Sequence, residues 1–195
     1  LGGNAPVLIF DDVDVIAVAK AAALARFRNN GQVCIAPQRF YVHHKIYHQF
    51  AEAVTAFVAA IKVGEGFEEG VQVGPLITRK QRDSVLELLE QSKDEQAEIL
   101  TGGMVPAERQ KGYFIQPAVV GGLDQQSVLA RNEIFGPVLP LFSFTDAADA
   151  IQKANDTEYG LAAYIFTNNL TTAIHVSEAL EFGMVGINEW APHGT

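Results

Sequence analysis

Short, almost wholly apolar runs alternate along this chain with helical patterns, and this alternation limits the fold more than any other feature. Residues 7–10 form such a run between Pro6 and an acidic pair, which is typical of a strand buried on both faces. Further strands are expected at 39–43, 113–120, 138–144, 162–166 and 184–188. Because helical patterns fill the spaces between them, the sequence predicts an α/β fold, with a mostly parallel sheet and helices on both faces.

The first helical pattern is an Ala-rich stretch that Asp12 can cap and that runs to Arg28. Residues 29–31, Asn-Asn-Gly, stop this helix. A second helix is expected from one apolar stripe at steps of three and four residues: Phe50, Val54, Phe57, Val58 and Ile61.

A third helix is expected behind a capping box formed by Thr78 and Gln81, and two more over residues 146–154 and 170–180. The glycine cluster at 64–74 is interpreted as a loop between elements. No convincing linker divides the chain, so we expect one domain.

The charge of the chain argues against some partners. With 14 basic and 23 acidic side chains, it lacks the clusters of Lys and Arg that nucleic acids and anionic membranes favour. The most apolar run, residues 13–24, carries Asp14 and Lys20 and is too short to span a membrane. The single cysteine, Cys34, forbids an internal disulfide and fits a reducing compartment, so the cytoplasm is the expected location.

Cys34 is the candidate nucleophile. A lone cysteine is more often a small buried apolar residue, but Cys34 ends a loop of glycine and small polar residues. Such a loop lets backbone N–H groups point toward a reacting oxygen, and a thiolate is strongly nucleophilic. The loop lies between a helix and a strand, where we expect a ligand to approach an α/β sheet.

Five ordered motifs carry a family resemblance. Residues 27–34 read Phe-Arg-Asn-Asn-Gly-Gln-Val-Cys, which closely resembles the catalytic cysteine motif of the NAD(P)-dependent aldehyde dehydrogenase superfamily. Residues 1–6, Leu-Gly-Gly-Asn-Ala-Pro, resemble the end of that family's Glu-Leu-Gly-Gly motif. The cofactor-contacting segment is matched by Asn-Glu-Ile-Phe-Gly-Pro-Val at 132–138, and 155–161 and 186–188 follow in family order. The resemblance therefore covers the whole chain.

The resemblance implies an oxidation of a small aldehyde to the acid with NAD or NADP. Cys34 would attack the aldehyde carbon to give a thiohemiacetal, which passes hydride to the nicotinamide and leaves a thioester that water cleaves. The backbone N–H of Cys34 would be one oxyanion donor. Cofactor contacts are implied for Gly2, for Glu133 on the ribose hydroxyls and for Phe135 near the ring. Taken alone, Glu133 would be a carboxylate in an ordinary Gly-Pro turn.

Arg28 is the candidate for binding a substrate carboxylate, because a guanidinium offers a planar pair of donors. A solvated arginine at a helix end is the alternative. The succinate-semialdehyde dehydrogenase branch resembles this chain in having arginine there, which favours a semialdehyde substrate. That branch often has a second cysteine where this chain has Ala36.

The resemblance also implies that residues 1–195 form a catalytic domain without the amino-terminal NAD(P)-binding domain and the carboxy-terminal oligomerisation strand. The family's general-base glutamate would immediately precede Leu1, and the chain ends at 193–195 before the family's Pro-Phe-Gly-Gly segment. We therefore expect a homo-oligomeric parent enzyme and a fragment inactive as a dehydrogenase. The alternatives are a thiol esterase and a ligand-binding or structural relative without catalysis.

No metal site is expected. His44 and His48 have the spacing of helical zinc ligands, but Lys45 stands where a metalloprotease has its glutamate, and no third ligand is evident. Residues 64–66 begin like a dinucleotide fingerprint, yet the next glycine, Gly70, comes one place too late.

Overall fold

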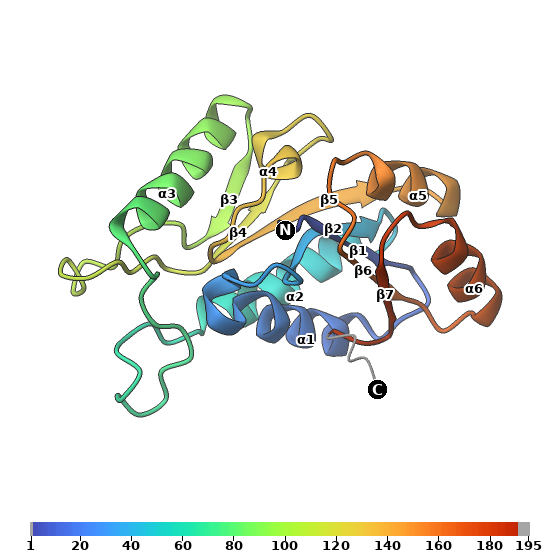
Figure 1. The fold of residues 1–195 in the computed structure, drawn as a ribbon. Coiled ribbons are helices and arrows are strands. Elements are labelled where there is room, and N and C mark those ends of the chain that lie inside the picture. Colours follow the sequence, from blue (N-terminus) through green and yellow to red (C-terminus); the bar gives the residue numbers. More distant parts are fainter. Residues whose placement is uncertain (1, 191–195) are drawn as a thin grey trace.

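The computed structural model describes residues 2–190; Leu1 and residues 191–195, including the 193–195 end, lie outside the described part. Its centre is a seven-stranded sheet in the spatial order β3-β4-β5-β2-β1-β6-β7 (Figure 1). The strands are β1 (Ala5–Ile9), β2 (Pro37–His43), β3 (Glu98–Thr101), β4 (Ala118–Gly121), β5 (Val138–Phe144), β6 (Ala162–Phe166) and β7 (Met184–Ile187). All neighbouring strands are parallel except β3 and β4, so the expected α/β architecture is confirmed.

Helices cover both faces of the sheet (Figure 1). They are α1 (Val15–Phe27), α2 (Tyr47–Ala59), α3 (Arg79–Asp94), α4 (Val128–Arg131), α5 (Ala147–Asn155) and α6 (Leu170–Ala179), with a short 3₁₀ turn over Arg28–Gly31. One hydrophobic cluster joins α1 and α2 to one face, and the others join α3 to α6 to the opposite face. In β1, Val7 and Ile9 face the first cluster while Leu8 faces α5 and α6.

The cap of the first helix differs from the prediction. Asp14, directly before Val15, accepts a hydrogen bond from the N–H of Ala17. Asp12 lies too far ahead of the helix to cap it; its carboxylate instead accepts hydrogen bonds from the hydroxyl of Thr167 and the N–H of Asn168, after β6. The predicted cap was wrong because α1 begins two residues later than expected, so Asp14 and not Asp12 directly precedes it.

The capping box at the start of α3 is only half formed. Thr78 accepts a hydrogen bond from the N–H of Gln81 as predicted. The side chain of Gln81 does not return it; it donates to the carbonyls of Ile134 and Phe135. The first turn of α3 is thereby tied to a segment more than fifty residues away.

Other boundaries shift for local reasons. The strand predicted at 113–120 begins only at Ala118, and Ile61 lies beyond the end of α2. The sequence patterns gave no sign of β3, a half-exposed edge strand, or of the single-turn helix α4. Between residues 2 and 190, no helix has the length and apolar character needed to cross a membrane.

Candidate functional site

The predicted site residues precede their strands. Gly2 and Gly3 lead into β1, Cys34 leads into β2 and Glu133 leads into β5. The strands are parallel, so these loops lie together at the edge where the strands begin. The Cys34 loop precedes its strand, whereas the rule that ligands bind at the loops of α/β sheets concerns loops that follow strands. The rule was therefore the wrong reason for expecting a ligand at Cys34.

The loop before Cys34 is a left-handed turn. Asn29, Asn30 and Gly31 have φ values of 51°, 59° and 68°, a region that Asn and Gly tolerate best. The side chain of buried Asn30 donates to the carbonyls of residues 74 and 75, and the side-chain oxygen of Gln32 accepts from the N–H of Ile77. The turn is thus fastened to the segment before α3.

Cys34 is half-buried, and its thiol is free. Its backbone N–H donates to no other residue of the described chain. The carbonyl oxygen of Cys34 faces Gly3: a Cβ at Gly3 would overlap this oxygen and lie 2.9 Å from the carbonyl carbon. Cys34 therefore combines a free thiol and an available N–H with a backbone in close contact with the start of β1.

Glu133 lies on the other side of the same two glycines. Its Oε1 accepts a hydrogen bond of 2.8 Å from the N–H of Gly3. A Cβ at Gly2 would lie 2.9 Å from Oε2 of Glu133 and 3.0 Å from Cε1 of Tyr159. The glycine pair therefore runs between Cys34 and Glu133, which lie 99 residues apart in sequence.

The segment around Glu133 is fastened by three side chains from distant elements. Gln38 of β2 bonds the peptides on both sides of Glu133. Gln81 of α3 bonds the carbonyls of residues 134 and 135, and Arg26 of α1 bonds that of residue 136. Phe135, held in this way, has a positive φ of 48° and is half-buried. A residue that is neither Gly nor Asn is strained there, and such strain is concentrated at functional sites.

Arg26 is a fully buried cation in this arrangement. Its guanidinium donates to the carbonyls of Pro37, Gly136 and Val138. Burial lowers its pKa to about 9, against the opposing charge of Glu133, so the group is still charged at neutral pH. Arg26 thereby joins the starts of β2 and β5.

Tyr164 of β6 supports the chain just after Cys34. Its hydroxyl donates to the carbonyl of Ile35 at 2.5 Å. Burial, followed by the nearby charges of Cys34 and Glu189, raises the pKa of Tyr164 to about 12. The hydroxyl is therefore a stable donor at neutral pH.

A cavity of about 410 Å³ lies beside Cys34. Its lining includes Val33 and Ile35 on either side of Cys34, together with Arg28 and Trp190. Arg28 is exposed, and its guanidinium makes no hydrogen bond or ion pair within residues 2–190. An uncommitted guanidinium and an apolar wall suit a small ligand with one anionic end.

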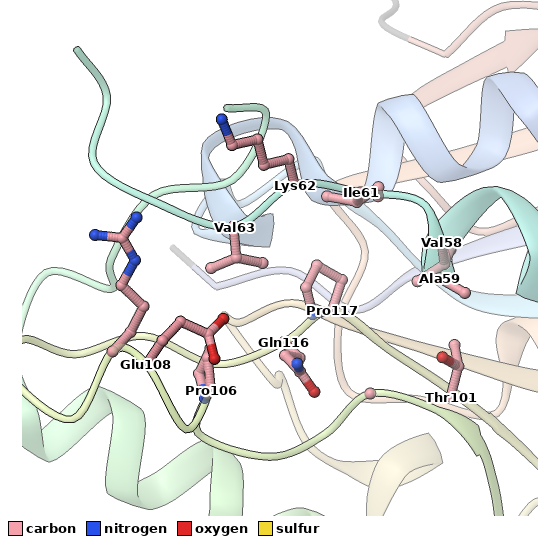
Figure 2. Close-up of a pocket in the computed structure, with 12 residues that line it drawn as sticks. Val58, Ala59, Ile61, Lys62, Val63, Thr101, Pro106, Glu108, Gln116 and Pro117 are labelled. Carbon is pink, nitrogen blue, oxygen red and sulfur yellow. The ribbon is translucent and has the colours of Figure 1, made fainter. Parts of the chain in front are cut away.

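A second cavity, of about 430 Å³, lies between the end of α2 and the segment after β3 (Figure 2). Two basic side chains that line it already have partners: Lys62 donates to the carbonyl of Glu69, and Arg109 forms an ion pair with Glu68. None of the sequence-predicted site residues lines it. Within the described chain, no three His, Cys, Asp or Glu side chains gather at a position that could hold a metal ion.

The remaining motifs separate into two places. Tyr159 lies against Gly2, close to Glu133. Asn155 bonds the backbone at Ala179 and Glu181, and so it ties the end of α5 to the end of α6. Asn188 follows β7 at the opposite edge of the sheet, where its amide pairs with Thr167.

Comparisons with known proteins identify the family of the chain. The model of the aldehyde dehydrogenase family matches residues 1–195. The chain belongs to this family. It is 42% identical to glutarate-semialdehyde dehydrogenase of Pseudomonas putida and 40% identical to the NADP(+) succinate-semialdehyde dehydrogenase GabD of Escherichia coli. Each match covers 100% of the chain and 41% of the relative, so the chain spans about two-fifths of these relatives.

Solved structures of the aldehyde dehydrogenase family have the same fold. An E. coli NADP-dependent enzyme matches with a TM-score of 0.95 at 39% identity, over 100% of this chain and 40% of that one. The NAD+ complex of aldehyde dehydrogenase from Bacillus cereus matches with a TM-score of 0.94 at 34% identity, over 100% and 39%. The expected family membership and catalytic-domain fold are thereby confirmed.

Sequence reasoning missed the residues that hold the site together, chiefly Arg26, Gln38, Gln81 and Tyr164. One signal was available for two of them. Gln38 adjoins the apolar strand predicted at 39–43, and Arg26 interrupts an Ala-rich helix. Buried polar groups need hydrogen-bond partners, so each marks a place where distant segments meet.

Proposed function

We propose that this chain provides the nucleophile, part of the cofactor site and part of the substrate site of an enzyme that oxidises an aldehyde to its carboxylic acid with NAD or NADP. The observation that carries the proposal is the arrangement of Cys34 and Glu133 on two sides of Gly2 and Gly3. The residue that carries the free thiol contacts this glycine pair through its backbone, and the half-buried carboxylate of Glu133 bonds the same pair, which supports a reaction between a thiol adduct and a bound dinucleotide.

In the proposed reaction the thiolate sulfur of Cys34 forms a bond to the aldehyde carbon, and the carbonyl oxygen becomes an oxyanion. The uncommitted N–H of Cys34 is available to donate to this oxyanion. NAD(P)+, when bound near Glu133, would supply the acceptor for the hydride and its electron pair, and Cys34 would then carry the product as a thioester. Addition of water then cleaves the carbon–sulfur bond, releases the acid and restores the thiol.

The carboxylate of Glu133 fits a role at the nicotinamide ribose. Its Oε1 is fixed by Gly3, while Oε2 has no hydrogen-bond partner within the described residues. A fixed carboxylate with one free oxygen is suited to accept from sugar hydroxyls. Phe135 follows two residues later and is proposed to pack near the ring, and Gly2 is proposed to leave room for the cofactor beside Glu133.

A semialdehyde is the proposed substrate class. Arg28 is free to bind a carboxylate and lines the cavity beside Cys34, so it would hold the acid end of a substrate whose aldehyde end reaches the thiol. The names of the relatives, glutarate- and succinate-semialdehyde dehydrogenases, support the same substrate class. We further propose that residues 1–195 act as the catalytic domain of a homo-oligomeric enzyme.

The test uses the protein in its natural length with succinate semialdehyde, glutarate semialdehyde and the uncharged propanal. We expect NAD(P)H formation that Cys34→Ala abolishes. Arg28→Gln should raise KM for the semialdehydes about tenfold or more and leave KM for propanal unchanged, because only the semialdehydes have a carboxylate that Arg28 can bind. No NAD(P)H formation by the wild-type protein with any aldehyde would refute the proposal.

A thiol esterase is the second candidate, favoured by the free thiol and uncommitted N–H of Cys34. Hydrolysis of a nitrophenyl ester without cofactor, lost in Cys34→Ala, would support it. If ester hydrolysis occurs and aldehyde oxidation does not, the esterase is the function.

A further inference from the structure

Gln38 occupies an unusual place for an amide. It lies in β2, one of the central strands, and only 2% of the residue is exposed. A buried amide without partners would destabilise the fold, but Gln38 uses both of its donors and its acceptor. Nε2 donates to the carbonyl of Asn132 at 2.8 Å and to Oδ1 of Asn4, and Oε1 accepts from the N–H of Ile134 at 2.8 Å.

These partners lie on both sides of Glu133. The peptide that precedes Glu133 gives its carbonyl to Gln38, and the peptide that follows Glu133 gives its N–H. Residues 132–137 belong to no helix or strand, so no backbone ladder fixes this stretch. The Gln38 amide replaces the missing ladder at the residue whose side chain faces Gly3.

The second donor of Gln38 links this stretch to the start of β1. Asn4, 1% exposed, accepts from Gln38 and donates to the carbonyl of Ala130. The next residue, Gly3, bonds the Glu133 carboxylate. The carboxylate of Glu133 is therefore held by Gly3, and the peptides around Glu133 are held through Gln38 by Asn4, the next residue at the start of β1.

We propose that Gln38 is a positioning residue that sets the Glu133 carboxylate for the nicotinamide ribose and thereby determines cofactor affinity. This inference rests on the proposed role of Glu133. Gln38 makes no hydrogen bond to Cys34, and it does not line the cavity that Val33 and Ile35 border. Its loss should therefore weaken cofactor binding and leave the reactivity of Cys34 unchanged.

The experiment compares two variants of the protein in its natural length. Gln38→Met keeps the volume and removes all three hydrogen bonds. Gln38→Glu keeps the shape and the acceptor, but an ionised carboxylate cannot donate to Asn132. Gln125→Met is the matched control, because Gln125 also bonds a hydroxyl and a backbone carbonyl, those of Tyr41 and Lys153, away from Glu133.

The readouts are KM for NAD(P)+, the dissociation constant of NAD(P)H, and the rate of Cys34 alkylation by iodoacetamide. Gln38→Met should raise both cofactor constants about tenfold, the lower end of the range found when hydrogen bonds that orient metal ligands are lost. Its alkylation rate should stay within twofold of wild type. Gln125→Met should change melting temperature but neither cofactor constant.

Gln38→Glu adds a pH readout that a purely structural role would not produce. Burial raises the pKa of a carboxyl group, and the protonated acid can again donate to Asn132 while accepting from Ile134. The KM of this variant for NAD(P)+ should therefore fall toward wild type as the pH is lowered from 8 to 6. If Gln38→Met does not fold, this pH series tests the same inference.

The outcomes separate the two levels of the argument. Suppose Glu133→Gln raises KM for NAD(P)+ and Gln38→Met leaves it within twofold of wild type: the proposed function stands and the positioning role is overturned. Equal losses of cofactor affinity and Cys34 alkylation in Gln38→Met also overturn it, since they indicate general disruption. If neither Glu133→Gln nor Gln38→Met changes cofactor affinity, the assigned role of Glu133 fails, and this inference fails with it.

Discussion

Replacing Gly3 by alanine should disrupt the contact between β1 and the cysteine loop. The added Cβ would overlap the carbonyl oxygen of Cys34 and lie 2.9 Å from its carbonyl carbon, inside ordinary van der Waals contact. The obstacle is backbone, so no side chain can rotate away. Gly3 has no positive φ, which means that alanine meets no conformational strain of its own there. The cost is therefore purely steric.

The magnitude follows from the overlap. Extra methylenes in a packed interior cost roughly 1–3 kcal/mol where side chains can adjust. A clash with fixed backbone belongs at the upper end, so we expect a loss of about 3 kcal/mol in the free energy of unfolding. For a chain of this size, that corresponds to a fall in melting temperature of roughly 6–12 °C.

Gly66→Ala is the matched control for Gly3→Ala. A Cβ at Gly66 would have no atom within 4 Å, and its φ is not positive. The control should stay within about 0.5 kcal/mol of wild type. Unfolding in urea gives the stabilities, and iodoacetamide alkylation reports whether the Cys34 loop has moved. The steric reasoning would be refuted if the two alanine variants had equal stability and alkylated at the wild-type rate.

Three further predictions concern other contacts. Tyr164→Phe removes the donor to the Ile35 carbonyl and should cost about 1–2 kcal/mol in urea unfolding; an unchanged midpoint would contradict this. Arg39→Met removes the guanidinium that donates to the buried carbonyls of Asn4, just before β1, and of Ala154 in α5, so the melting temperature should fall by the equivalent of about 3 kcal/mol; wild-type stability would show that these carbonyls find other partners. Hydrogen bonding to Arg131 lowers the pKa of Asp156 below its usual value of 3.8, so this group stabilises the fold above that value and the stability is lost as the pH falls through the lowered pKa. Asp156→Asn should therefore lose less than about 1 kcal/mol at pH 7, because the pair is partly exposed, and the difference should shrink in unfolding curves taken at acid pH.

The layers of the fold were predictable because their signals are local. The apolar runs at 138–144 and 162–166 coincide with β5 and β6, and the predicted helices lie between the strands. β3 was missed because an antiparallel edge strand with half-exposed residues has no apolar run to detect. Asp12 was predicted as the cap because the sequence does not fix the first residue of a helix to within one or two positions, and Asp12 and Asp14 both precede the Ala-rich stretch.

The candidate residues of the site could be named from the sequence, whereas the residues that hold them in place could not. Motif order identified Cys34 and Glu133, and the structure places them on two sides of Gly2 and Gly3. The bond from the N–H of Ile134 to the side-chain oxygen of Gln38 joins residues 96 positions apart, and no periodic pattern in the sequence indicates such a pairing.

The position of the site at the beginning of the strands has an electrostatic consequence. Helices that lead into these strands end there, so their carboxy-terminal carbonyls bring the negative end of each helix dipole toward this edge. Arg39, buried among them, donates to the last-turn carbonyls of Lys153 and Ala154 in α5, and Arg26 serves the carbonyls at the start of β2 and β5. These two buried guanidinium groups therefore offset the negative helix ends at the edge where Cys34 and Glu133 lie.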